Sequence, residues 1–161
     1  MTRIDLLERL RVLTIDATAD IIMPTALQKG DEEQGCRAAD VHLMRLPDSS
    51  SAKKKAPYII HQLITGKDSQ VSGSEASASA VVRSIFCVYN DNEEDGALML
   101  VNIMERLRIR LLKQVVIDGR YQLDLQAGLE SLVYIDNIAP YYAGEMVSTW
   151  KLPAIKREIK P

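Results

Sequence analysis

The sequence has few of the residues that cross-link or staple a small fold. Only two of its 161 residues are cysteines, Cys36 and Cys87, and they form no C-x-x-C spacing. Neither a disulfide framework nor a structural zinc site is therefore expected. We interpret both residues as reduced thiols, with Cys87 serving as a small apolar side chain in a strand.

Long hydrophobic runs and an excess of one charge are also lacking. No apolar run approaches the ~20 residues that cross a bilayer, and acids interrupt the stretch where a signal peptide would have its apolar core. The net charge of −2 is too balanced for a protein that grips DNA with its whole surface. The composition predicts a soluble, intracellular, single-domain protein over residues 1–161, with no membrane contact.

Complete catalytic motifs are absent from the sequence as well. Residues 66–68 resemble the end of a phosphate-binding loop, but Asp68 stands where that loop requires Ser or Thr. Residues 73–77 lack the second glycine and the central serine of a nucleophile elbow. The two histidines, His42 and His61, each stand alone in a predicted strand. We therefore expect no enzyme, with no catalytic residue, cofactor or metal site.

Two alternative functions remain open at this point. Cys87 and His61 lie in strands that could be neighbours, so a thiol–imidazole dyad is conceivable and would make the protein a small Cys/His-dependent enzyme. A small-ligand or nucleic-acid binding module is the other possibility.

The hydrophobic periodicity predicts an α+β fold, with a mainly antiparallel β-sheet packed by one long central helix and an N-terminal helix. The expected helices span residues 2–17 and 95–116. The expected strands span residues 40–46, 57–65, 80–89, 121–125, 129–135 and 144–152. Flexible loops are expected at 48–56 and 66–78, and an extended tail at 153–161. Residues 18–39 give no clear pattern.

Three of these elements carry side-chain patterns that can be checked individually. On the first helix we expect a buried stripe formed by Ile4, Leu7, Leu10 and Leu13. The strand at 80–89 is apolar on both faces, which predicts a central strand covered on both sides. The last strand places on one face Met146, Ser148, Trp150 and Leu152.

The long helix is apolar around most of its circumference. Such a helix needs more than one apolar neighbour, so we expect the N-terminal helix and an adjacent subunit to cover it. Arg106, Arg108 and Arg110 interrupt this surface on different faces, which favours ion pairs between subunits. The acids at 93–95 are interpreted as the start of the helix, where negative charge is favourable.

The order of segments resembles that of the tail-terminator (tail-completion, minor capsid) proteins of long-tailed bacteriophages and prophages. A strand begins Ala56-Pro57-Tyr58, and a later strand ends Val88-Tyr89-Asn90-Asp91 ahead of the long helix. The closing segment contains Pro140-Tyr141-Tyr142-Ala143-Gly144 and ends Trp150-Lys151-Leu152-Pro153. The resemblance covers residues 40–159, about three-quarters of the chain.

This resemblance implies a structural protein of the virion tail or neck, assembled in the cytoplasm of a bacterial host. Its copies would form a ring, hexameric in the assembled tail, that caps the tail tube and joins the head. The implied partners are tail-tube and head-completion proteins, with DNA passing through the lumen unbound. Acids at 31–33 and 93–95 could line that lumen. Another neck, head-completion or tail-tube protein is the related alternative.

Overall fold

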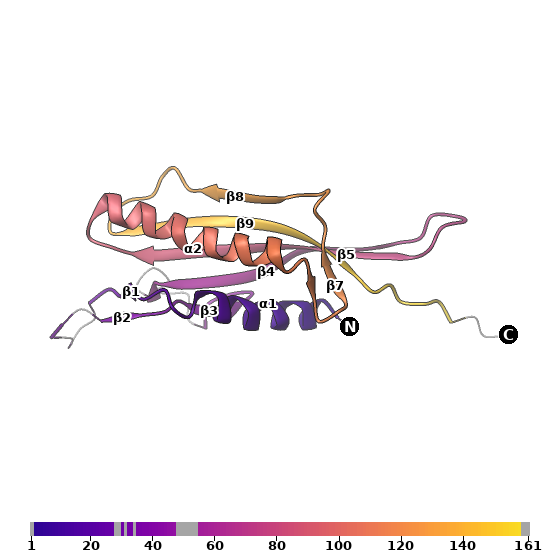
Figure 1. The fold of residues 1–161 in the computed structure, drawn as a ribbon, viewed down its shortest axis with the longest axis horizontal. Helices are drawn as coiled ribbons and strands as arrows, with labels where there is room; N and C mark the ends of the chain where they lie inside the picture. The colour runs from indigo at the N-terminus through magenta and orange to yellow at the C-terminus, as the bar shows by residue number, and fades with distance from the viewer. Residues whose placement is uncertain (1, 28–29, 31, 34, 48–54, 159–161) are drawn as a thin grey trace.

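The computed structural model describes residues 2–27, 30, 32–33, 35–47 and 55–158. Two helices, α1 (Arg3–Thr18) and α2 (Glu93–Lys113), accompany a seven-stranded sheet (Figure 1). The strands of this sheet are β3 (Asp40–Leu43), β4 (Tyr58–Ser69), β5 (Ser77–Tyr89), β6 (Val116–Ile117), β7 (Tyr121–Leu123), β8 (Leu129–Val133) and β9 (Tyr141–Leu152). A separate two-stranded pair consists of β1 (Met23–Pro24) and β2 (Cys36–Arg37).

The sheet is mainly antiparallel, as the sequence predicts. Its order is β3-β4-β5-β9-β7-β6, and β8 pairs with the part of β9 that β7 leaves uncovered. Only β3 and β4 run parallel. The predicted α+β class is therefore confirmed. The long helix does not occupy the centre alone, because α1 packs beside α2 in the same hydrophobic core.

Burial alternates along β9 and indicates which of its side chains face the helices. Met146, Ser148 and Trp150 are buried while their neighbours are partly exposed, which confirms the predicted face for these three residues. Trp150 is fully buried, and its indole Nε1–H donates to the Ser148 hydroxyl at 2.8 Å. A buried tryptophan thus has a partner for its one polar group.

The first helix begins where the sequence predicts it. The side chain of Thr2 accepts a hydrogen bond from the backbone of Asp5, so Thr2 caps the helix. Leu7, Leu10 and Leu13 are buried as expected, but Ile4 is 70% exposed. The prediction for Ile4 is wrong because a spacing of three residues drifts by ~60° per step around a helix. The buried side of the helix also includes Leu6 and Ala17.

The long helix α2 begins at Glu93, two residues before the predicted start, and also ends earlier than expected. Asn92 caps it by accepting from the backbone of Asp95, and the first turn carries the acids at 93–95. The helix ends at Lys113 rather than near residue 116, because Val116 already belongs to β6. Leu100, Ile103 and Leu107 face the sheet and are almost fully buried.

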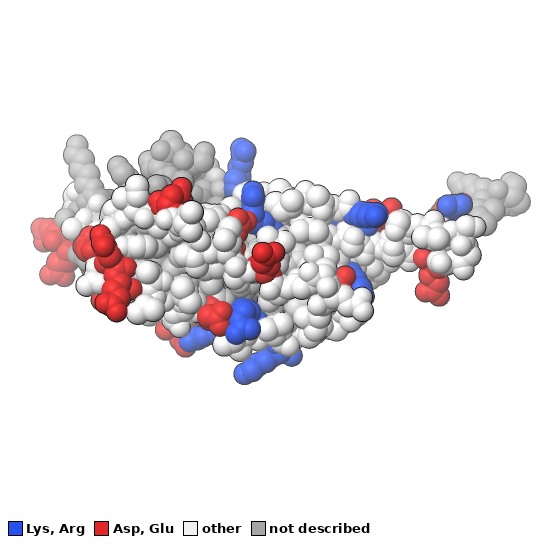
Figure 2. Space-filling view, turned by 90° about the horizontal axis from the view of Figure 1, so that it is seen from above, with Lys and Arg blue, Asp and Glu red and all other residues white. Residues whose placement is uncertain are grey.

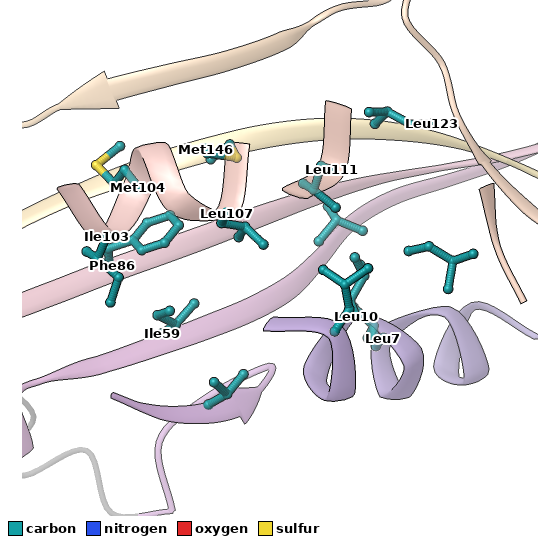
Figure 3. Close-up of a cluster of buried hydrophobic side chains, with 14 of the residues drawn as sticks. Leu7, Leu10, Ile59, Phe86, Ile103, Met104, Leu107, Leu111, Leu123 and Met146 are labelled. Atoms are coloured by element: carbon teal, nitrogen blue, oxygen red, sulfur yellow. The ribbon is translucent and has the colours of Figure 1, made fainter. Parts of the chain in front are cut away.

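The main core lies between both helices and one face of the sheet (Figure 3). Phe86 of β5, Leu107 of α2 and Leu10 of α1 all belong to it. The opposite face carries only a small cluster, consisting of Leu46, Ala56, Tyr58, Ile60 and Cys87. The expectation that both faces of residues 80–89 are covered is therefore only partly right, since Arg83 and Ile85 on the second face remain half-exposed.

The predicted loop at 66–78 is largely a β-hairpin. The strands β4 and β5 pair as far as Ser69 and Ser77, and only the residues between them form the turn. This hairpin projects beyond the helices, and the C-terminal segment leaves the body at the same end (Figure 1). Of the other predicted loop, 48–54 lies outside the described residues, whereas Ala56 is buried in the small cluster. Within the described chain, no helix is long and apolar enough to cross a membrane.

Gly96 is required where α2 meets β9, because a Cβ added there would collide with the ring of buried Tyr142. Alanine normally stabilises a helix relative to glycine. We nevertheless expect Gly96→Ala to lower the free energy of unfolding by about 1–3 kcal/mol, the usual cost of overpacking. Urea unfolding measures this. The control Asn102→Ala, at an exposed position of α2, should leave stability equal or slightly raised. A stabilised Gly96→Ala variant would contradict the contact.

Candidate functional site

The structure separates the two residues of the conceivable catalytic dyad. Their strands are neighbours, but His61 pairs with Ser84 and Cys87 pairs with Tyr58. Ser84 and Cys87 are three positions apart on β5, so their side chains point to opposite faces of the sheet. The imidazole of His61 lies on the helix side, and the thiol of Cys87 lies in the small cluster on the other side. A Cys87–His61 dyad is therefore not formed.

His61 is instead held between two hydroxyl groups. Its Nδ1 lies 2.8 Å from Oγ of Ser84, and its Nε2 lies 2.8 Å from Oγ1 of Thr14 on α1. Burial, and then the nearby charge of Arg11, lowers the pKa of His61 to about 4. A neutral imidazole offers one donor and one acceptor, which these hydroxyls satisfy. The group ties α1 to the sheet.

The serine in this group is not placed for catalysis. Ser84 is 4% exposed, His61 is 1% exposed, and α1 lies over both. The second imidazole nitrogen faces a threonine hydroxyl, whereas a hydrolytic triad has a carboxylate there to stabilise the imidazolium. Thr14 and Ser84 were not predicted as partners of His61, because no local pattern links residues so far apart in the chain.

The two thiols differ in their environment. Cys36 is exposed on β2, whereas Cys87 is 3% exposed and lies beside the hydroxyl group of Tyr58. Burial, and then the proximity of Cys87, raises the pKa of Tyr58. Neither thiol shares a site with an imidazole or forms part of a ligand set. Indeed, no three His, Cys, Asp or Glu side chains come together as metal ligands in the part of the chain that is described.

The three arginines of α2 have carboxylate partners within the same chain. Arg106 contacts Asp20 at 2.6 Å, and Arg110 contacts Asp16 at 2.9 Å, so both link α2 to α1 and the residues just after it. Arg108 pairs with Glu105 one turn away at 2.9 Å. Within one chain these arginines are therefore already paired, and the expected ion pairs between subunits stay a prediction. Because α1 lies alongside α2, the carboxylates of Asp16 and Asp20 are close enough to pair with these arginines.

The outward face of α2 carries apolar side chains that are uncovered within the described chain, although the Glu105–Arg108 ion pair interrupts them. It presents Leu98, Val101, Ile109 and Leu112, which are 62%, 41%, 43% and 39% exposed. Their spacing places them on one stripe of the helix. The part of the earlier expectation that concerned α1 is confirmed, since α1 contacts α2. Coverage of this stripe by a neighbouring subunit remains a prediction.

Acidic side chains gather at one end of the molecule (Figure 2). This end holds the first turn of α2, with exposed Glu93, Glu94 and Asp95. Glu32 and Glu33 are also exposed, while Asp31 lies outside the described residues. At the other end, open grooves of about 330 and 370 Å³ separate the hairpin from the C-terminal segment. Their lining includes Ala76, Ile155 and Arg157, without a convergent set of reactive groups.

Comparisons with known proteins provide no family assignment. No family model matches the chain, and no curated protein matches it either. The most distinctive features are surfaces rather than a reactive centre.

The burial of His61 predicts a specific pH dependence. Between pH 6.5 and 4 the unfolded chain binds a proton that the folded protein does not, so stability falls as the pH is lowered through this range. Urea unfolding from pH 7.5 to 4.5 should show that His61→Gln removes about 2–3 kcal/mol of this loss. The control Ser84→Ala keeps the imidazole and should keep the steep slope. Equal slopes for wild type and His61→Gln would contradict a buried neutral histidine.

The different burial of the two thiols predicts stepwise labelling. A maleimide should add one label to the native protein, at Cys36, and a second only after unfolding. The Cys36→Ser variant should take up no label while folded. Intact-mass spectrometry reads both counts. Native labelling of Cys36→Ser at the rate of an exposed thiol would show that Cys87 is accessible.

Proposed function

We propose that this protein is a structural subunit that assembles with copies of itself into a ring, as a tail terminator of a long-tailed phage or prophage. In this role it caps the tail tube and provides the surface to which the head is joined. The proposal combines the resemblance of residues 40–159 with the shape of the molecule. In this role the protein acts through the fit between protein surfaces and turns over no substrate.

The observation that carries the proposal is the extended shape of the subunit. The hairpin of β4 and β5 and the C-terminal segment project beyond the part of the sheet that the helices cover (Figure 1). A ring subunit buries two different patches, each about 800 Å² for an interface of standard size. Projecting segments of this kind offer surface for such contacts.

The apolar stripe of α2 supports the same proposal. Single exposed apolar residues are ordinary, but a contiguous apolar patch marks an interaction site. In the proposed ring, the outward face of α2 contacts a neighbouring subunit or the tube below, and the helix then becomes central to the assembly. Tail-tube and head-completion proteins are the proposed partners, within the tail or neck of the virion.

The acidic end suits a passage for DNA. Carboxylates repel phosphate groups, so DNA would slide past Glu93, Glu94 and Asp95 rather than bind. We include this orientation in the proposal. The related role of a neck, head-completion or tail-tube protein would use the same surfaces. The alternative of a Cys/His-dependent enzyme has lost its geometric basis, since His61 and Cys87 lie on opposite faces.

The test is the mass of the protein in solution as a function of concentration. Sedimentation velocity and native mass spectrometry should show the 18.0 kDa chain giving way to one closed species, of about 108 kDa for a hexamer, as concentration rises. Negative-stain electron microscopy should show rings of one size. A chain that stays monomeric up to about 1 mM would contradict self-assembly, and open filaments would contradict a closed ring.

A further inference from the structure

We propose that two edge strands of the sheet pair with each other between copies, so that the outer edge of β8 in one subunit joins the outer edge of β3 in the next. This inference rests on the proposed function, because it names the contact by which the copies assemble. We call the contact the seam and define it by Val41–Leu43 of β3 and Ser131–Val133 of β8. Neither outer edge has a strand partner among the described residues.

The two edges lie at the same height along the strands. Registered neighbours form continuous rows across the sheet from β3 to β8. One row consists of Val41, Ile59, Phe86, Gly144 and Val133. The next two rows begin at His42 and Leu43 and end at Leu132 and Ser131. A rotation about an axis parallel to the strands therefore brings β8 of one copy beside β3 of the next without any shift.

The strand directions are also compatible. β3 is parallel to β4, and each following step, from β4 to β5, to β9 and to β8, is antiparallel. As a result, β8 runs opposite to β3. A rotation about an axis along the strands preserves these directions, so the seam would be an antiparallel pair, which is the commoner and slightly more stable arrangement.

The residues whose backbone N–H and C=O groups point outward alternate in the same way along the edges of β8 and β3. On β8, the N–H of Tyr134 donates to Ala143 of β9, so Leu132 also faces β9, while Ser131 and Val133 direct their backbone groups outward. On β3, Asp40 and Met44 donate to β4, so the outward residues are Val41 and Leu43.

With the rows aligned, outward residues meet outward residues across the seam. Val133 lies opposite Val41, and Ser131 lies opposite Leu43. These are the positions at which an antiparallel ladder exchanges hydrogen bonds. The carbonyl of Leu43 already accepts from the N–H of Arg45, so Leu43 contributes its N–H. A shift by one residue would lose this match.

The side chains at the seam favour a protein strand as the occupant. Leu132 and Val133 are 52% and 42% exposed, and β8 has no lysine or proline to keep another strand away. Exposed Glu130 lies in the row of registered residues that ends at Gln62 on β4. The side chain of Gln62 donates a hydrogen bond to the carbonyl of Met44, and exposed Arg45 is the next residue in the chain. In this register Glu130 of one copy lies at the level of Met44, the residue before Arg45, in the other copy.

A second copy of the chain matches all of these features at once. The contact joins two different edges, so it is heterologous and generates a ring when the rotation closes. Each copy contributes five strands at this height, from β3 to β8. Six copies at a strand spacing of about 4.8 Å would close into a ring of sheet about 45 Å across.

A proline at the outward position of β8 tests the backbone contact. Ser131→Pro removes an N–H that points away from β9, so the fold should persist, as circular dichroism and thermal melting will show. Its association measured by sedimentation should be about tenfold weaker or more than that of wild type. The control Ser131→Ala keeps the N–H and should assemble like wild type. Equal association of both variants would overturn the seam.

A cysteine pair tests the register. In a Cys36→Ser background, His42→Cys with Leu132→Cys places two thiols opposite each other at a position where Cα atoms lie about 4.5 Å apart, which suits a disulfide. Mild oxidation should give covalent ladders of copies on a non-reducing gel. The matched control, His42→Cys with Ser131→Cys, differs by one residue and points its thiols to opposite faces. It should remain uncrosslinked.

The combined outcomes separate the seam from the proposed function. Assembly of the wild type together with crosslinking of the first cysteine pair only, and weakened association of Ser131→Pro, supports both. Assembly that is insensitive to Ser131→Pro, with no specific crosslink, overturns the seam and leaves the ring. No assembly of the wild type at any concentration, with no crosslink from either pair, overturns both.

Discussion

Apolar contact between two helices and a single face of the sheet is the constraint on which the rest of the structure depends. Leu10 of α1 and Leu107 of α2 enter one core with Phe86 of β5 (Figure 3). The His61 imidazole, between hydroxyls of Thr14 and Ser84, fixes α1 against the same face. Because both helices lie on one side, the other side keeps only a small cluster, and neither outer edge of the sheet has a partner within the described residues.

This one-sided arrangement explains why surfaces dominate the functional argument. The buried His61 imidazole has hydroxyl partners on both nitrogens, and the arginines of α2 pair with carboxylates of the same chain. The buried hydroxyl of Tyr142 is an exception, since it has no hydrogen-bond partner among the described residues. Apolar side chains on the outer face of α2 and backbone groups at the edges of β3 and β8 also remain uncovered there. Both are features that a neighbouring protein, rather than a small substrate, can cover.

Elements specified by local patterns were predictable. The cap at Thr2, the acids at the start of α2 and the alternation around Trp150 depend only on neighbours in the sequence. The hairpin at 66–78 was missed because glycine, serine and charged residues are typical of loops. Its strands form through pairing of Lys67 with Ser79 and similar contacts between its two sides, which composition does not report.

The sequence by itself determined the α+β class, the helix starts and the inward face of the last strand, because helical and strand periodicity is a property of consecutive residues. Only the tertiary structure decided that Cys87 and His61 face apart, that Arg106 and Arg110 find acids near α1, and that β3 and β8 end at one height. Each of these depends on strand register or on contacts between distant segments. A shift of one residue reverses the face of a side chain, and the sequence of one strand alone does not fix that register.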